Sequence, residues 1–289
     1  MRRGVACVVL LAACRPELGP PDSLVTRERV IAVIAEPPES GPGEAVAYRA
    51  VVASPSGPVD GAAATWGFCA TPKPLTDNNL VASACLVDAR PIADPARAET
   101  PRDACRSFGP DPPPGGLRPR DPDVTGGFYQ PVRVALGAER AFRLQRVSCS
   151  LPSAPLDVAV AFAAAYRPNE RPVVRELSLT AEGAPIAPGD RVPGGATIGL
   201  RVSWDASAEE PYVVYDPVAR ALSGRTEALA VTWFVSGGEV ADEVTGGAAA
   251  HSSETSWRAP AAGRAWVWAV LRDERGGVDA AVAEVDVAR

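Results

Sequence analysis

Four cysteines, Cys69, Cys85, Cys105 and Cys149, carry the chemistry that this sequence specifies most clearly. In a chain that leaves the cytoplasm an even set of thiols forms disulfides, whereas a zinc site calls for Cys-x-x-Cys or Cys/His groupings, and none is present. Three pairings are possible. We favour Cys69–Cys85 with Cys105–Cys149, because the first bond closes a short loop worth about 3 kcal/mol in the chain-entropy model.

Other reactive side chains do not assemble into a recognisable catalytic motif. The single histidine, His251, lies in a Gly/Ala/Ser loop, and no Gly-x-Ser-x-Gly elbow accompanies it. Asp121-Pro122-Asp123-Val124-Thr125 superficially resembles a haloacid-dehalogenase phosphatase motif, but the preceding GGLRPR is no buried strand. Calcium needs six to eight oxygens, so turn roles explain these acids better, as they do Asp273, Glu274 and Asp279. We expect no enzyme, cofactor or metal.

The start of the chain indicates export. Arg2 and Arg3 precede the apolar run GVACVVLL, and the small residues Ala12 and Ala13 precede Cys14. A charged start, a short apolar core and small residues at a cleavage point are typical of a secretory signal, here residues 1–13. A spanning helix needs about 20 apolar residues, and this run is about half that length.

Leu11-Ala12-Ala13-Cys14 resembles the lipobox of bacterial lipoproteins. The resemblance implies cleavage before Cys14, a diacylglycerol on its thiol and a further acyl chain, such as palmitate, on its amine. Residues 14–26 then form a tether to the bilayer, since more than one acyl chain gives stable anchoring. Arg15, where Asp retains some lipoproteins at the inner membrane, favours the outer membrane. A plain secretory signal with an incidental cysteine is the alternative.

Composition excludes some partners and favours strands over helices. The formal net charge is −6 and no basic patch occurs, so nucleic acid is not an expected partner. The 30 prolines and few aromatic residues argue against a helical bundle and suit short strands joined by turns. The length suffices for two ordinary domains.

The first domain, residues 27–168, begins with strands over 29–35, 46–52 and 63–69. Trp66 at the centre of the third strand resembles the tryptophan of strand C in immunoglobulin-like sandwiches. An irregular insert, residues 70–127, contains Cys85 and Cys105, so we expect disulfides to pin it. Strands resume at 130–136 and 142–149, the latter with a phase slip that suggests a bulge. Residues 155–166 suit a short helix slightly better than a strand.

The second domain, residues 169–289, repeats this outline with strands over 173–180, 198–204 and 229–235. Trp257-x-Ala259-Pro260, Gly263 and the alternating Val267, Ala269 and Leu271 resemble the closing strands of polycystic-kidney-disease-type and related bacterial immunoglobulin-like domains. The family's usual aromatic residue would fall on Ala265. The fold class is therefore all-β, with two tandem immunoglobulin-like β-sandwiches.

This strand pattern makes Trp266 and Trp268 candidate binding residues. If Val267, Ala269 and Leu271 face the core, the two tryptophans face outwards and can stack on a sugar or anchor a partner. Two alternatives are a reversed phase, with both tryptophans in the core, and coverage of the pair by the polar excursion 205–225.

The function that these features favour is a lipid-anchored, non-catalytic binding, spacer or assembly module of the cell envelope. Its partners would be the bilayer, through acylated Cys14, and an envelope protein or glycan. Carbohydrate binding by exposed tryptophans is the second hypothesis, and an envelope hydrolase that uses the insert as its active-site loop is the third.

Overall fold

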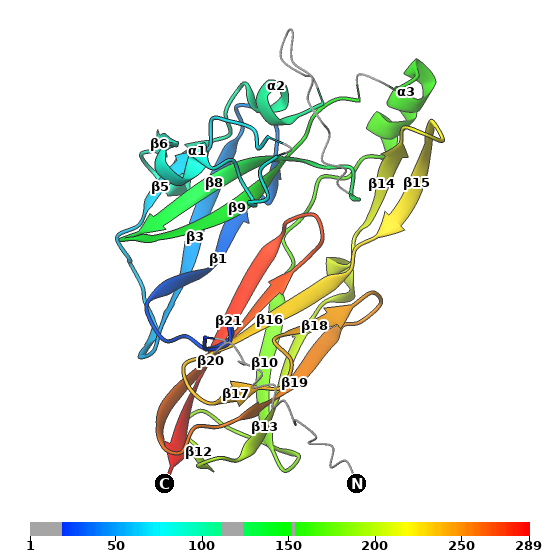
Figure 1. Cartoon of the computed structure of the whole chain (residues 1–289). Coiled ribbons are helices and arrows are strands. Elements are labelled where there is room, and N and C mark those ends of the chain that lie inside the picture. Colours follow the sequence, from blue (N-terminus) through cyan, green and yellow to red (C-terminus); the bar gives the residue numbers. More distant parts are fainter. Residues whose placement is uncertain (1–18, 75, 111–123, 152–153) are drawn as a thin grey trace, which may run out of the picture.

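The computed structural model describes residues 19–74, 76–110, 124–151 and 154–289 (Figure 1). The expected signal peptide, Cys14 and the first residues of the tether lie outside the described residues, as do Asp121 and Asp123. No helix within these ranges has the length and apolar character needed to cross a membrane.

Two sheets form the first sandwich (Figure 1). One contains β1 (Arg29–Glu36), β3 (Ala45–Ser54), β4 (Gly57–Pro58) and β7 (Ala98–Glu99). The other has the order β2 (Glu39–Ser40), β9 (Glu139–Val147), β8 (Phe128–Leu136), β5 (Thr65–Phe68) and β6 (Arg90–Ile92). Strands β8 and β9 pair in one unbroken register, so the bulge expected near residue 145 is wrong; the register shift lies in β1, between Val30 and Ala32.

The second sandwich also has two sheets. One has the order β11 (Ala184–Pro185), β10 (Val174–Ala181), β13 (Thr197–Trp204), β19 (Ser252–Arg258) and β17 (Glu239–Val240). The other has the order β12 (Arg191–Pro193), β21 (Val278–Ala288), β20 (Gly263–Arg272), β16 (Leu229–Val235) and β18 (Val244–Gly247). Their alternating apolar residues meet in one core that includes Trp204, Trp233 and Trp257.

The two sandwiches share an immunoglobulin-like strand plan. In each, the first strand pairs antiparallel in one sheet, β1 with β3 and β10 with β13. A short continuation then crosses to the other sheet and pairs in parallel with the last strand, β2 with β9 and β12 with β21. A tryptophan lies on the corresponding interior strand of each, Trp66 on β5 and Trp233 on β16, the fourth strand of its five-stranded sheet. The fold is all-β with two tandem sandwiches.

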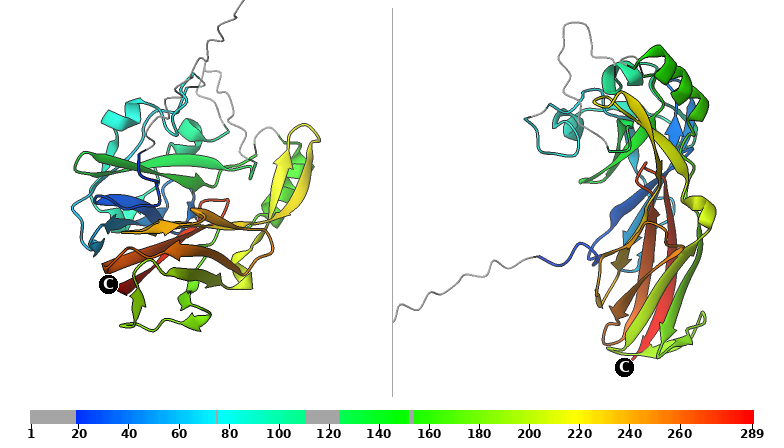
Figure 2. Two further views of the ribbon diagram at one scale, coloured as in Figure 1. Left: turned by 60° about the horizontal axis from the view of Figure 1, so that its bottom comes forward. Right: turned by 90° about the vertical axis from the view of Figure 1, so that its right-hand side faces the viewer.

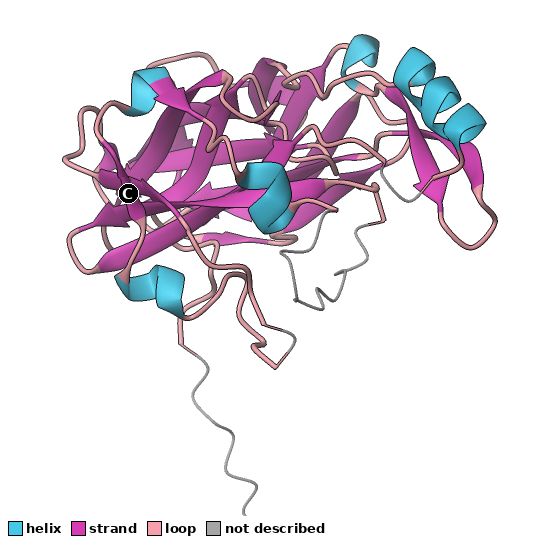
Figure 3. Ribbon diagram, turned by 90° about the horizontal axis from the view of Figure 1, so that it is seen from above, coloured by secondary structure: helices cyan, strands magenta, loops and turns pink. Residues whose placement is uncertain are grey.

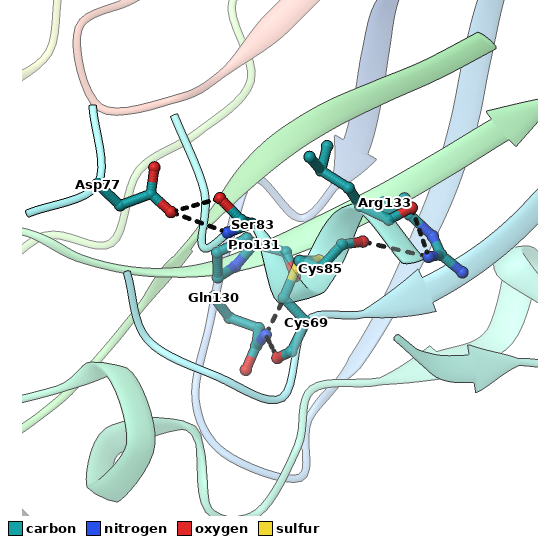
Figure 4. Close-up of a disulfide and its surroundings, with 8 residues drawn as sticks. Cys69, Asp77, Ser83, Cys85, Gln130, Pro131 and Arg133 are labelled. Carbon is teal, nitrogen blue, oxygen red and sulfur yellow. Dashed lines mark hydrogen bonds between the residues drawn. A yellow bond between two sulfur atoms is a disulfide. The ribbon is translucent and has the colours of Figure 1, made fainter. Parts of the chain in front are cut away.

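The insert is partly built into the first sandwich. Its strands β6 and β7 extend the two sheets. The short helix α1 (Ala84–Val87) precedes β6, η1 (Pro95–Arg97) lies between β6 and β7, and α2 (Ala104–Phe108) follows β7. Disulfides join Cys69 to Cys85 and Cys105 to Cys149, the pairing that the spacing favours. Figure 4 shows that Gln130 donates to the Cys69 carbonyl (2.8 Å) and Arg133 to the Cys85 carbonyl (3.1 Å), so strand β8 holds both ends of the first bridge.

A helix and a hairpin project beside the sandwiches and form what we call the arm. The ambiguous residues 155–166 are helical, as α3 (Leu156–Ala165). The 205–225 excursion consists of η2 (Ala206–Ala208) and the hairpin of β14 (Pro211–Asp216) and β15 (Ala221–Thr226). Figure 3 shows α3 alongside this hairpin. The arm does not cover the tryptophan pair of β20. The first sandwich covers it instead.

Candidate functional site: the junction between the two sandwiches

Strand β20 is apolar on both faces, and both faces are buried. Ala265, Val267, Ala269 and Leu271 lie in the core of the second sandwich, as expected. Trp266, Trp268 and Val270 point the opposite way, also as expected, but they pack into a second apolar cluster rather than facing solvent. Trp268 is only 1% exposed, and Trp266 is half-buried. The prediction of an exposed tryptophan pair for sugar or partner binding is therefore wrong.

The first sandwich supplies the surface that covers these tryptophans. Ile31 and Ile34 of β1 and Ala53 of β3 lie in the same cluster as Trp268 and Val270. Gly57 of β4 approaches Trp266 so closely that a Cβ there would lie 2.6 Å from Cε2 of its ring. The two tryptophans thus join the outer sheet faces of the two sandwiches. Fully burying one large apolar side chain contributes about 1.5–3 kcal/mol.

The segment that precedes β1 is also part of this junction. Val25 is 1% exposed and shares the apolar cluster with Trp268. The Val25 amide donates to the Val235 carbonyl and the Val235 amide to the Ser23 carbonyl, both at 2.8 Å, which adds a short parallel bridge at the end of β16. The prediction of a free tether over residues 14–26 is therefore wrong for residues 23–25, because their backbone and side chains are bound to the second sandwich.

One edge of the junction is polar and centres on Glu39 of β2. Glu39 is 3% exposed and accepts hydrogen bonds from Ser148 (2.8 Å), Tyr166 and the backbone amide of Asn169 (2.9 Å). The Arg146 guanidinium lies 3.3 Å from the Glu39 carboxylate. A buried carboxylate is costly unless it is paired. These contacts to Glu39 therefore fix residues 166–173, which we call the linker, onto the first sandwich.

A second buried group, which we call the Arg275 cluster, holds the linker onto the other sandwich. The Arg275 guanidinium is fully buried and pairs with Glu227 (2.5 Å) and Glu210 (2.7 Å), and it donates to the Arg167 carbonyl (2.9 Å). Asp273 accepts from the backbone amides of Arg275 (2.9 Å) and Gly277 (2.7 Å), and from the Asn169 side chain at 3.3 Å.

The Arg275 cluster has more carboxylates than cations. Burial, together with the negative charge of Asp273, raises the pKa of Glu227 to about 7, although Arg275 opposes this shift. Burial also raises the pKa of Asp273 and of Glu210. In the folded protein Glu227 is therefore mostly protonated below about pH 7, and the junction gains negative charge as the pH rises through neutrality.

A surface ion pair completes the contacts between the sandwiches. Arg171 in the linker bridges Glu36 of β1 and Asp279 of β21, each at 2.8 Å. Arg272 of β20 donates to the Ile31 carbonyl of β1 at 3.1 Å. These contacts, the apolar cluster and the docked N-terminal segment therefore all connect the sheet that contains β1 to the sheet that contains β20.

The other residues singled out from the sequence take structural roles. Asp273 accepts from backbone amides and from Asn169, and Asp279 accepts from the Val174 amide and pairs with Arg171. Tyr212 donates to Glu274 at 2.5 Å. His251 is an exposed loop residue 3.7 Å from Glu209. Within the described ranges no group of three or more His, Cys, Asp or Glu side chains is placed to hold a metal ion.

Sequence reasoning missed the polar part of the junction. Asn169, Glu227 and Arg275 are each 2% exposed or less, yet they are separated in sequence by tens of residues. No motif links them, since only the folded chain brings the linker, the start of β16 and the β20–β21 turn together. The apolar part did leave a signal, because RVIAVIA and AWVWAVL are both apolar on two faces.

Comparison with known proteins gives no family for this chain. No family model matches it, and no curated protein matches it. Among solved structures it is similar to the D0-D1 domain of intimin, with 10% identity, a TM-score of 0.25 and coverage of 90% of this chain and 99% of that one.

Two further solved structures are similar at the same level. The Yersinia pseudotuberculosis adhesin InvE has 13% identity and a TM-score of 0.24, with coverage of 88% of this chain and 58% of that one. Domains 4 and 5 of the S-layer protein SbsC have 11% identity and a TM-score of 0.22, with coverage of 55% and 65%. Because all three TM-scores are below 0.5, the fold assignment rests on the strand order of the chain itself.

Proposed function

We propose that this protein is a lipid-anchored, non-catalytic binding and assembly module of the cell envelope. The observation that carries the proposal is the docked segment Ser23–Val25, which joins both sandwiches immediately after the stretch that contains Cys14. Acyl chains on Cys14 would therefore hold both sandwiches as one body rather than as two independently moving domains.

The reach of the anchor follows from chain length. Nine peptide units separate Cys14 from Ser23, and an extended chain spans at most about 3.5 Å for each, or roughly 30 Å in all. Figure 2 shows that the docked segment lies where the two sandwiches meet. Both sandwiches would thus sit close to the bilayer, in place of an arrangement with the second one farther out.

Two further features support an envelope location. The four remaining cysteines are paired, and disulfides persist in oxidising compartments outside the cytoplasm. The lipobox-like stretch ends on Cys14, the residue that such proteins acylate. Arg15 at the position after Cys14 favours the outer membrane over the inner one.

Detergent partitioning of the full chain, expressed in a bacterium that makes lipoproteins, tests the anchor. We expect the wild type to enter the detergent phase and the Cys14→Ser variant to remain in the aqueous phase. A Cys7→Ser variant is the matched control, since that cysteine lies in the expected signal and its loss should change nothing. Aqueous partitioning of the wild type would contradict the proposal.

A further inference from the structure

The arm contains a groove between the end of α3 and the β14–β15 hairpin, which we call the arm groove. Its cavity has a volume of about 530 Å³, within the range of ligand sites. Ala165, Pro211, Val213 and Gly224 provide small or apolar surface, and Arg167 and Arg225 provide charge. Figures 1 and 3 both place α3 beside the hairpin and away from the two cores.

The two arginines of the arm groove are available to an anion. Neither guanidinium takes part in an ion pair with any residue that the structure describes, whereas Arg146, Arg171 and Arg275 all do. Arg225 interacts with the Tyr212 hydroxyl, which donates to Glu274. On a chain with a net charge of −6, two exposed arginines beside an apolar cavity are complementary to carboxylates.

The backbone that lines the arm groove is held in place by the buried Arg275 cluster. The Arg167 carbonyl accepts a hydrogen bond from buried Arg275 at 2.9 Å, and the Arg275 guanidinium lies 4.8 Å from the centre of the Tyr212 ring. The Arg275 cluster therefore fixes the backbone at Arg167 and the start of β14. Such preorganisation lowers the entropic cost of binding.

Strand β15 offers an unpaired backbone edge next to this cavity. It pairs with β14 on one side, and no other described strand pairs with it. Five of its six residues are exposed, and a Cβ added at Gly224 would meet nothing within 4 Å. An open edge of this kind accepts an extended segment through main-chain hydrogen bonds.

We propose that the arm groove binds an extended acidic peptide segment of a partner protein. The peptide backbone pairs with the free edge of β15, its carboxylates meet Arg167 and Arg225, and an apolar side chain between them enters the cavity beside Val213. This inference rests on the proposed binding role and names the chemistry of the partner. An edge strand with flanking arginines favours a peptide over a sugar, which has no backbone to pair.

Fluorescence anisotropy with a labelled peptide, Glu-Val-Glu-Val-Glu-Val, tests the proposal on the full chain in neutral detergent. We expect saturable binding that Arg167→Glu and Arg225→Glu each weaken at least about tenfold, the scale of one lost charge-assisted contact. Arg191→Glu, an exposed arginine on β12, is the matched control and should leave the affinity unchanged. Gly224→Val should abolish binding without changing the melting temperature, since its side chain fills open space.

Several outcomes would overturn the proposal. These are absence of binding at about 1 mM peptide, equal binding of a peptide with Gln for every Glu, or equal weakening by Arg191→Glu. Binding of phosphatidylglycerol vesicles that needs Arg167 and Arg225, with no binding of the peptide, would assign the groove to a lipid headgroup instead. Cys14→Ser separates this test from the anchor, because it should abolish partitioning and leave peptide binding intact.

Discussion

The two sandwiches follow the same strand plan but are stabilised by different means. The second packs Trp204, Trp233 and Trp257 into one continuous core, and it contains no cysteine. The first divides its apolar residues between smaller clusters, one of them around Cys69 and Cys85, and its Trp66 is only half buried. Both disulfides lie in the first sandwich, where the insert interrupts the strands.

This difference indicates that the cross-links compensate for an irregular backbone and a smaller core. Loops contribute few buried apolar contacts, so restricting the unfolded chain is an alternative route to stability. The first sandwich also gains from its neighbour, because the outer face of β1 is buried against β20. The following changes test which of these contributions holds each part, from the largest expected effect to the smallest.

Trp268→Ala should cause the largest loss, about 3–5 kcal/mol of unfolding free energy, because it opens a cavity at the centre of the junction. Hydrogen exchange should report loss of protection in β1 and β20 together, since both strands contribute to the cluster. Val282→Ala, a nearby residue of β21 that is 44% exposed, is the control and should change stability by less than about 0.5 kcal/mol. Equal effects of the two variants would contradict burial of Trp268.

Removal of the disulfides should destabilise the first sandwich selectively. In the chain-entropy model, Cys105→Ala/Cys149→Ala costs about 4 kcal/mol and Cys69→Ala/Cys85→Ala about 3 kcal/mol. The difference arises because Cys105–Cys149 closes a loop of 44 positions and Cys69–Cys85 a loop of 16. Hydrogen exchange in urea should show earlier opening of β5 and β8 with β13 and β19 unchanged. The comparison between the sandwiches fails if β13 and β19 lose as much protection as β5 and β8.

Gly57→Ala should cost about 1–3 kcal/mol, since the new Cβ would meet the Trp266 ring and Gly57 has a φ of +123°. Thermal unfolding measures the loss. Gly61→Ala is the matched control, because Gly61 has a φ of +65° and nothing within 4 Å of an added Cβ. A larger loss for Gly61→Ala would show that backbone conformation, not contact with Trp266, sets the effect.

The Arg275 cluster should make stability depend on pH. The folded protein raises the pKa of Glu227 from 4.5 to about 7, so its contribution is complete below about pH 4.5 and is lost as the pH rises through 7. The slope is at most about 1.4 kcal/mol per pH unit for one proton. Urea unfolding between pH 5 and pH 8, roughly the span of the shift, measures it. In Glu227→Gln this slope should decrease to the part that Asp273 and Glu210 contribute, because burial raises their pKa values as well; an unchanged slope would assign it to other groups.

The sequence predicted the strands well wherever apolar residues alternate clearly. Leu229, Val231, Trp233 and Val235 are all buried, as their spacing indicates, and the disulfide pairing agrees with the shorter-loop argument. The same reasoning failed for Trp266 and Trp268, since alternation determines which face a residue occupies but not what covers that face. Only the packing of β1 against β20 decides their exposure.

The candidate site was predictable in part. The runs RVIAVIA and AWVWAVL leave apolar side chains on both faces of a strand, which is the pattern of strands buried on two sides. The two runs indicate that each strand is covered on both faces, but they do not identify the surface that covers it. Glu39, Asn169 and Arg275 were not predictable, because a buried polar group depends on partners that only the tertiary fold brings within hydrogen-bond distance.

The central claim is that the two sandwiches form one rigid body through the Trp268 face. Pulsed electron spin resonance between labels introduced by a noncanonical amino acid at Val87 and Val244, exposed residues of the first and second sandwich, measures it most directly. We expect one narrow distance distribution in the wild type and a broad one in Trp268→Ala. A broad distribution in the wild type would contradict the account, since it would mean that the sandwiches move independently.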